Sequence, residues 1–321
     1  MERRALLLGL GGLVAMPVRA QSPIPEVGFL HPGRSAALAP RLAAVLEGLR
    51  GRGFIDGQNV SVVARFADLD AQKMKTYAVE LVQRNVGAIL AVGPQAVLDT
   101  RVATTTVPIV ALDLESDPVK SGLIERLSHP GGNVTGLFFD FPDFSTKWLE
   151  LLGETIPGLA RLGVLWDPST GTVQLDAVTA AAERRKLTLQ ILKVAGPSEL
   201  DPAFLAADDA RAQAVLALSS PVFGTMPQQV AEAALRHRMP TITLFPEYAE
   251  AGGLMAYGTN LTDLFRQAGE MVGKVLAGTK AADLPVERPS RFELVVNLKT
   301  AAALGVAIPQ VVQLRADRLI E

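Results

Sequence analysis

The chain of 321 residues contains no cysteine, only three histidines, and aromatic side chains at 5% of its positions. The lack of cysteine excludes disulfide bonds, thiol catalysis, cysteine metal sites and a lipid-anchored cysteine. The histidines, His31, His129 and His237, are widely separated and form no metal-ligand spacing such as HExxH. We therefore expect neither a metal centre nor another cofactor.

A strong charge of either sign is also missing. The formal net charge is −2 at pH 7, which gives no support to binding of a phosphate backbone. The nucleophile pattern Gly-x-Ser-x-Gly is absent, and Gly273-Lys274 is not followed by the Ser or Thr of a phosphate-binding loop. We therefore expect no nucleic-acid partner and no enzymatic activity, and we assign no catalytic residue.

The start of the chain predicts a cleavable signal peptide over residues 1–20. Arg3-Arg4 precedes an apolar run from Ala5 to Met16, and Val18-Arg19-Ala20 offers the small residues that a signal peptidase reads. This run is too short to span a bilayer, and no later segment has enough uninterrupted apolar residues. We expect export to the periplasm, with an uncleaved anchor as the alternative. Whether the Sec or the twin-arginine route is used stays open.

From residue 27 onward, strand-like apolar runs alternate with segments of helical spacing, among them the predicted helices 38–50 and 261–276. Continuous runs such as Ala88–Val92 are typical of strands buried on both faces of a parallel sheet. The predicted strands are 27–30, 60–66, 88–92 and 108–112, and then 162–166, 187–194, 214–218, 241–245, 254–257 and 292–296. Strands joined by helical crossovers lie parallel. The two series predict an α/β fold of two doubly wound, Rossmann-like lobes.

A turn separates the two series. Pro130-Gly-Gly-Asn-Val-Thr-Gly136 needs backbone freedom at its glycines and opens directly into the apolar run Leu137-Phe-Phe139. No low-complexity linker lies between the series, so we expect several strands to join the lobes. A two-lobed α/β protein carries its ligand in the cleft between the lobes, which makes this segment a candidate hinge.

Further motifs lie in order along nearly the whole mature chain. They are Gly57-Gln-Asn-Val60, Ala103-Thr-Thr-Thr-Val-Pro-Ile-Val110, Pro130–Gly136, Ala251-Gly-Gly-Leu-Met-Ala-Tyr-Gly258, Phe292–Ala301 and Leu304-Gly305. With these motifs the chain resembles the periplasmic substrate-binding proteins of ABC transporters, specifically the tryptophan/tyrosine-type family with the type I periplasmic binding protein fold.

The resemblance implies an arrangement of the lobes and a function. Three hinge crossings are expected near 133–139, 254–260 and 291–296. One lobe would comprise 25–136 plus 259–289, and the other 137–258 plus 290–321. The protein would be a monomeric receptor for a small-molecule ligand, a small organic acid or an amino acid, including aromatic ones. Its partners would be an ABC permease and ATPase in the inner membrane.

Candidate binding residues follow from the rule that ligands bind beyond the carboxyl ends of the strands. Gly93 and Gln95 stand where a helix begins, and its unpaired N–H groups suit a carboxylate. The other candidates are the hydroxyls of Ser35, Ser219 and Ser220, the apolar side chains of Phe141, Trp166 and Tyr248, the acid Asp113, and, from the resemblance, the hinge residues Asp140 and Thr259. Each has a structural alternative, because serines and acids cap helices and turns and Trp166 could pack in a core.

Two other functions stay open. A cofactor-free enzyme acting in the cleft would need an acid/base pair with perturbed pKa values, and His31 is the only histidine on these loops. A sensor that signals to a membrane partner would have the same sequence features. Adjacent permease and ATPase genes would favour import, and an adjacent histidine kinase gene would favour sensing.

Overall fold

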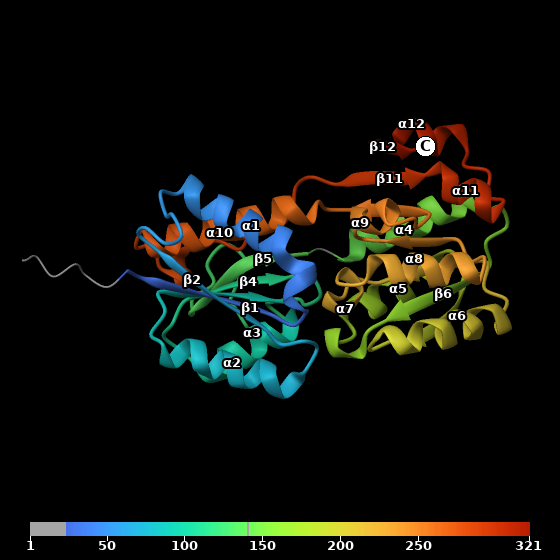
Figure 1. The fold of residues 1–321 in the computed structure, drawn as a ribbon. Coiled ribbons are helices and arrows are strands. Elements are labelled where there is room, and N and C mark those ends of the chain that lie inside the picture. Colours follow the sequence, from blue (N-terminus) through green and yellow to red (C-terminus); the bar gives the residue numbers. More distant parts are fainter. Residues whose placement is uncertain (1–23, 140) are drawn as a thin grey trace, which may run out of the picture.

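The computed structural model describes residues 24–139 and 141–321. The predicted signal peptide and the candidate Asp140 lie outside these residues. The chain forms two lobes, each built on its own sheet with helices on both faces (Figure 1). This confirms the predicted α/β fold. Among the described residues, no helix is both long and apolar enough to cross a membrane.

The first sheet has five parallel strands in the order β2-β1-β3-β4-β5. They are β1 (Glu26–His31), β2 (Ser61–Phe66), β3 (Ala88–Val92), β4 (Ile109–Asp113) and β5 (Val134–Phe138). The first four agree with the predicted strands to within one residue at each end. The prediction succeeds here because continuous apolar runs are stable only where both faces of the sheet are covered.

Two pairs of helices cover this sheet. They are α1 (Ser35–Gly51) and α10 (Leu261–Leu276) on one face, and α2 (Ala71–Gln83) and α3 (Pro94–Ala103) on the other (Figure 1). Successive residues of a strand serve opposite faces. Leu90 belongs to the apolar cluster that contains α10 residues, whereas Ile89 and Ala91 belong to the cluster that contains α2 residues.

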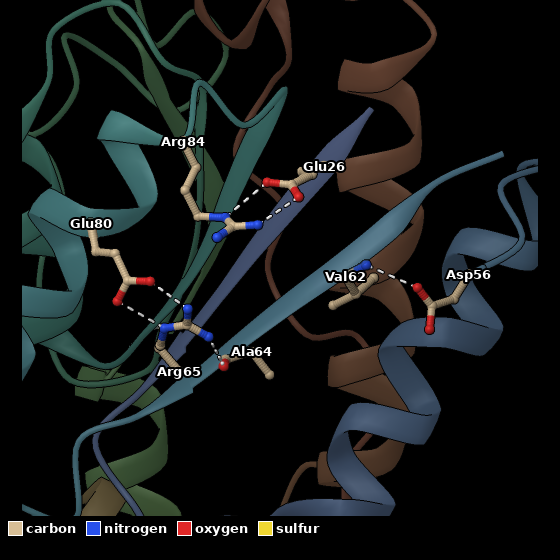
Figure 2. Close-up of polar contacts among 7 residues, drawn as sticks. All are labelled: Glu26, Asp56, Val62, Ala64, Arg65, Glu80 and Arg84. Atoms are coloured by element: carbon tan, nitrogen blue, oxygen red, sulfur yellow. Dashed lines mark hydrogen bonds and ion pairs between the residues drawn. The ribbon is translucent and has the colours of Figure 1, made fainter. Parts of the chain in front are cut away.

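Two bidentate ion pairs fix α2 against the edge of the first sheet (Figure 2). Arg65 of β2 pairs with Glu80 of α2, with 3.0 Å between Nε and Oε2. Arg84, which follows α2, pairs with Glu26 of β1 through bonds of 2.7 and 2.9 Å. A guanidinium matches a carboxylate in two parallel bonds, which restricts orientation as well as distance. These pairs therefore position α2 more than they stabilise the fold, because all four side chains are partly exposed.

The second sheet has seven strands in the order β12-β11-β10-β9-β8-β6-β7. They are β6 (Arg161–Trp166), β7 (Thr188–Lys193), β8 (Ala214–Ala217), β9 (Thr241–Thr243), β10 (Met255–Gly258), β11 (Glu293–Asn297) and β12 (Arg318–Ile320). All neighbours run parallel except β10 and β11, which are antiparallel. The predicted strand 241–245 is too long, because Phe245 is the N-cap of the following helix.

Helices on both faces of the second sheet complete this lobe. They are α4 (Phe141–Thr155), α5 (Val173–Arg184), α6 (Leu200–Asp209), α7 (Pro221–Gly224), α8 (Pro227–Arg236), α9 (Pro246–Glu250), α11 (Leu298–Leu304) and α12 (Gln310–Arg315), with single 3₁₀ turns at Pro168–Thr170 (η1) and Pro197–Glu199 (η2). A third 3₁₀ turn, Ala281–Asp283 (η3), lies beside β5 in the first lobe. The sequence did not predict α7, α9, α12 or β12, because elements of three to six residues are too short for apolar periodicity. α7 and α9 each begin with proline at the first helical position.

The chain passes between the lobes after β5, between β10 and α10, and before β11. The sequence predicted isolated crossing segments at these places. Instead, β5 pairs with β4 in the first sheet, and β10 pairs with β9 and β11 in the second. The connecting backbone is therefore short. The residue bounds that we expected for the two lobes stay a prediction.

An aromatic cluster holds the three passages together. Phe139 lies beside the first passage, Tyr257 before the second and Phe292 before β11. The ring centroid of Phe144 lies 4.1 Å from that of Phe139, 4.7 Å from that of Phe292 and 5.8 Å from that of Tyr257. Trp148, fully buried, donates its Nε1–H to the backbone oxygen of Tyr257 at 2.7 Å. We therefore expect the connecting backbone to bend beside this cluster when one lobe moves against the other.

Candidate ligand-binding site between the lobes

The two lobes meet at the carboxyl ends of their strands. A segment of the second lobe, residues 219–225 with α7, lies toward the first lobe (Figure 1) and makes polar contacts with it, and η1 of the second lobe lies against α3. Ser219 Oγ donates to Glu115 Oε1 at 2.6 Å, and Arg41 Nη2 donates to the backbone oxygen of Gly224 at 2.6 Å. Gly93 faces Pro221 so closely that a Cβ on Gly93 would lie 2.8 Å from Pro221 Cγ. The two lobes are therefore closed against each other along this line of contact, which we call the seam.

Two adjoining pockets lie along the seam. The inner cavity has a volume of about 30 Å³ and the outer pocket about 210 Å³. The inner cavity is lined by His31, Arg41, Val92, Gly93, Leu112, Leu114, Glu115, Ser220, Pro221, Gly224, Phe245, Leu261 and Phe265. The outer pocket is lined by Pro32, Ala67, Leu69, Asp70, Ala71, Met74, Val92, Gly93, Pro94, Gln95, Ala96, Asp167, Ser169, Thr170, Ala195, Pro221 and Val222. Both draw on both lobes, and Val92, Gly93 and Pro221 belong to both walls.

His31, the last residue of β1, lines the inner cavity and carries a buried hydrogen-bond donor. Its side chain is 1% exposed, and Nδ1 accepts the backbone N–H of Gly33 at 2.8 Å. Burial holds the pKa of His31 well below its usual value, so the ring is neutral. The single ring proton must then be on Nε2, since Nδ1 is an acceptor. Nε2 has no partner among the described residues.

Arg41 of α1 brings a cation to the same cavity. Its guanidinium lies 5.6 Å from the ring centroid of Phe265 and is bonded to Gly224. No carboxylate of the described residues lies within ion-pair distance of it. Burial lowers the pKa of Arg41, and electrostatic attraction to Glu247 opposes that shift only in part. A largely buried cation without an anionic neighbour in contact is costly, so this cation and the His31 donor together suit an anion.

Glu115 brings a carboxyl group to the same cavity. The side chain is 3% exposed, and burial is the main reason that its pKa rises to about 8, with repulsion from Asp113 adding to the effect. Asp113 itself accepts the backbone N–H groups of Glu115 and Ser116, both at 3.0 Å. On the second-lobe side of the contact, Asp167 Oδ2 accepts the hydroxyl of Ser220 at 2.6 Å. A positive group placed beside Glu115 would favour its ionised form.

Five of the predicted site residues lie at the seam. Gly93 belongs to both pockets, Gln95 to the outer pocket and Ser220 to the inner cavity. Ser219 contacts Glu115, and Asp113 orders the loop that carries Glu115. Gln95 also has a structural bond, because its Nε2 donates to Asp99 Oδ1 at 2.9 Å.

The other predicted residues lie outside the walls of the two pockets. Ser35 is exposed at the start of α1. Trp166 donates its Nε1–H to the backbone oxygen of Gly171 and packs against the core, and Tyr248 is buried in the core of the second lobe. Thr259 is buried after β10. Asp140 lies outside the described residues, as does the side chain of Phe141, the first residue of α4.

The sequence analysis missed Arg41, and it did not propose His31 or Glu115 as binding residues. A signal for Arg41 was present. It lies three residues after Leu38 and four before Val45, within the apolar face of its helix, where a charge is out of place. For Glu115 the signal was its position on a loop after a strand, where we favoured the neighbouring Asp113.

Comparisons with known proteins identify a family and relatives for this chain. The family model described as ABC transporter substrate binding protein matches residues 29–320. A tyrosine-binding protein from Clostridioides difficile is 25% identical over 261 residues, which cover 81% of this chain and 74% of that protein. The solved ABC domain from Streptococcus pneumonia in complex with L-Trp is 25% identical, with a TM-score of 0.83, and the match covers 92% of this chain and 99% of that one.

A third comparison bears on the closed seam. The ligand-free, open structure of a substrate-binding protein from Clostridium difficile is 24% identical and covers the same shares of the two chains, with a TM-score of 0.65. The present structure thus superposes better on the L-Trp complex than on the open form. The family match spans most of the chain, and this chain belongs to the ABC transporter substrate-binding protein family.

Proposed function

We propose that this protein is the extracytoplasmic receptor of an ABC importer and that it binds a free amino acid between its lobes. The observation that carries the proposal is the charge distribution of the inner cavity. Arg41 and the Nε2–H of His31 present donors there, and Glu115 presents a carboxyl group in the same wall. An α-amino acid carries both complementary charges, on an ammonium and a carboxylate that are bonded to the same carbon atom.

Each end of an amino acid meets a distinct need of the cavity. A carboxylate bonded to Arg41 and His31 would satisfy a partly buried cation and a buried unpaired donor at once. An ammonium beside Glu115 would offset the burial that disfavours its ionised form. A simple carboxylic acid meets only the first need, and an amine only the second. The relatives named for tyrosine and solved with L-Trp are consistent with this class of ligand.

The mechanism is a population shift toward the closed form. Arg41 and Glu115 belong to the first lobe, and Ser219 and Gly224 belong to the second. A ligand that touches both lobes binds the closed form better than the open one, and only this difference in affinity drives closure. After export and removal of residues 1–20, the closed receptor would dock on the membrane permease through the rims of both lobes, and the ATPase would drive import.

Titration calorimetry on the mature protein tests the proposal. We expect L-tyrosine to bind, and both its deaminated analogue and tyramine, which lacks the carboxylate, to bind at least about tenfold more weakly, since each loses one charge-assisted contact. Equal affinities for the three compounds would refute the assignment of the inner cavity. Absence of binding by every amino acid tested would refute the proposed function itself.

A further inference from the structure

Ser219 carries the hydroxyl that joins the second lobe to Glu115 of the first, and its own backbone lies just beyond the sheet. Leu218, the residue before it, still donates its N–H to the backbone oxygen of Leu165 in β6 at 3.0 Å. Among the described residues, no strand bonds to the backbone of Ser219, although this residue is only 1% exposed. Buried backbone groups need hydrogen-bond partners, so another part of the second lobe has to supply them.

The side-chain amide of Gln174 takes the place of the missing strand. Gln174 is the second residue of α5 and is 1% exposed. Its Oε1 accepts the backbone N–H of Ser219, and its Nε2 donates to the backbone oxygen of Ser219, both at 2.8 Å. A glutamine amide has a donor and an acceptor side by side, as a peptide group has. The backbone of Ser219 is therefore held in one orientation, from which its hydroxyl reaches Glu115 Oε1 at 2.6 Å.

We propose that Gln174 is a positioning residue for ligand binding, because it holds Ser219 where the hydroxyl bonds to Glu115, the residue that we assign to the amino group of the ligand. This inference rests on the proposed function and deepens it. Gln174 lines neither pocket, so its effect on affinity must pass through Ser219.

The hydroxyl of Ser219 supports the ionised form of Glu115. A hydrogen bond donated to a carboxylate is stronger than one donated to a neutral group. Burial and the repulsion from Asp113 and Asp167 raise the pKa of Glu115, and the bond from Ser219 opposes that shift. The other titratable or charged groups that line the cavity with Glu115 are His31 and Arg41. Since the ammonium of the ligand requires an ionised Glu115, loss of the Ser219 bond should weaken binding most at a pH where Glu115 is neutral without the ligand.

The rest of the segment that contacts the first lobe is held independently of Gln174. The hydroxyl of Ser220 donates to Asp167 Oδ2 at 2.6 Å and accepts the backbone N–H of Val222 at 2.9 Å. Asp167 therefore anchors the start of α7. Removal of the Gln174 amide should release Ser219 and leave α7 in place.

The variants Gln174→Met and Ser219→Ala and their double variant test the inference. Methionine is about as long as glutamine and has neither the amide donor nor the amide acceptor. The matched control is Gln213→Met. Gln213 also bonds to backbone, since it accepts from Ala160 and donates to Gly158, but it lies before β8, at the end of the sheet opposite the seam.

Calorimetry with L-tyrosine at pH 6 and pH 8.5 gives the dissociation constants, and the melting temperature shows that each variant is folded. If Gln174→Met does not fold, Gln174→Asn replaces it, because its shorter amide cannot reach both backbone groups of Ser219.

We expect Gln174→Met and Ser219→Ala each to weaken L-tyrosine about tenfold at pH 6 and only about threefold at pH 8.5, where most of the wild-type Glu115 is ionised. The double variant should bind no more weakly than Ser219→Ala, because both changes remove the same bond. Gln213→Met should bind as the wild type does at both pH values.

Three results would overturn the positioning role and leave the proposed function intact. They are an unchanged affinity in Gln174→Met, an equal loss at the two pH values, and a further loss of about tenfold when Gln174→Met is added to Ser219→Ala. If the wild type binds no amino acid, the proposed function and this inference both fail.

Discussion

The protonation of Glu115 should control ligand affinity. In the closed structure burial raises its pKa to about 8, so at pH 6 the carboxyl group of the closed form without a ligand is almost entirely neutral. A bound ammonium requires the ionised form. Binding must therefore release one proton below pH 8, and the dissociation constant for L-tyrosine should fall about 50-fold between pH 6 and pH 8. His31 stays neutral over this range, because burial holds its pKa well below the usual value.

Calorimetry in buffers of different ionisation enthalpy measures both the affinity and the proton release. The variant Glu115→Gln keeps the shape of the side chain and removes its titration, so its affinity should be low and independent of pH over the same range. A wild-type dissociation constant that stays flat between pH 6 and pH 8 would contradict the reasoning. So would an unchanged pH profile in Glu115→Gln, which would assign the titration to another group.

Three further predictions concern neighbouring residues. Arg41→Ala should weaken L-tyrosine by about 10- to 100-fold in calorimetry, as expected for loss of a hydrogen bond to a charged group, whereas Arg50→Ala, exposed on the same helix, should not change it. Gly93→Ala should lower the free energy of unfolding by about 1–3 kcal/mol in urea, because alanine is strained at φ +80°. In the same assay Gly153→Ala, in the last turn of α4 with no atom near the added Cβ, should raise it by up to about 0.5–1 kcal/mol. The folded-state pKa of His31 is depressed, so it contributes stability above its usual pKa that is lost as the pH falls. The melting temperature of the wild type should therefore drop more between pH 7 and pH 5 than that of His31→Gln, and equal drops would contradict the assignment.

The sequence predicted the long elements well because their physical signals are local. The strand Ala88–Val92 is apolar at every position, and the helix Leu261–Leu276 has a sustained apolar face, so both were found with their observed bounds. α7 has four residues and β12 has three, and neither carries a periodic signal. This matters for the site, because α7 makes the contacts of the second lobe with the first.

The candidate site was predicted only in part, for a related reason. The position of a loop at a strand end is local information, and it led to Gly93, Gln95, Ser219 and Ser220. Burial and pairing are not local. Trp166 was an equally good candidate for a binding wall, and the structure packs it against the core. Helix α1 was predicted, but its closeness to the second lobe was not, so the charge of Arg41 could not be assigned to the cleft.

Small-angle scattering on the mature protein tests the central claim most directly, namely that the lobes close around an amino acid. We expect the radius of gyration to decrease when L-tyrosine is added at saturating concentration, and to stay unchanged in Arg41→Ala at the same ligand concentration. Calorimetric binding of L-tyrosine to the wild type with no change in the radius of gyration would contradict closure of the lobes on the ligand.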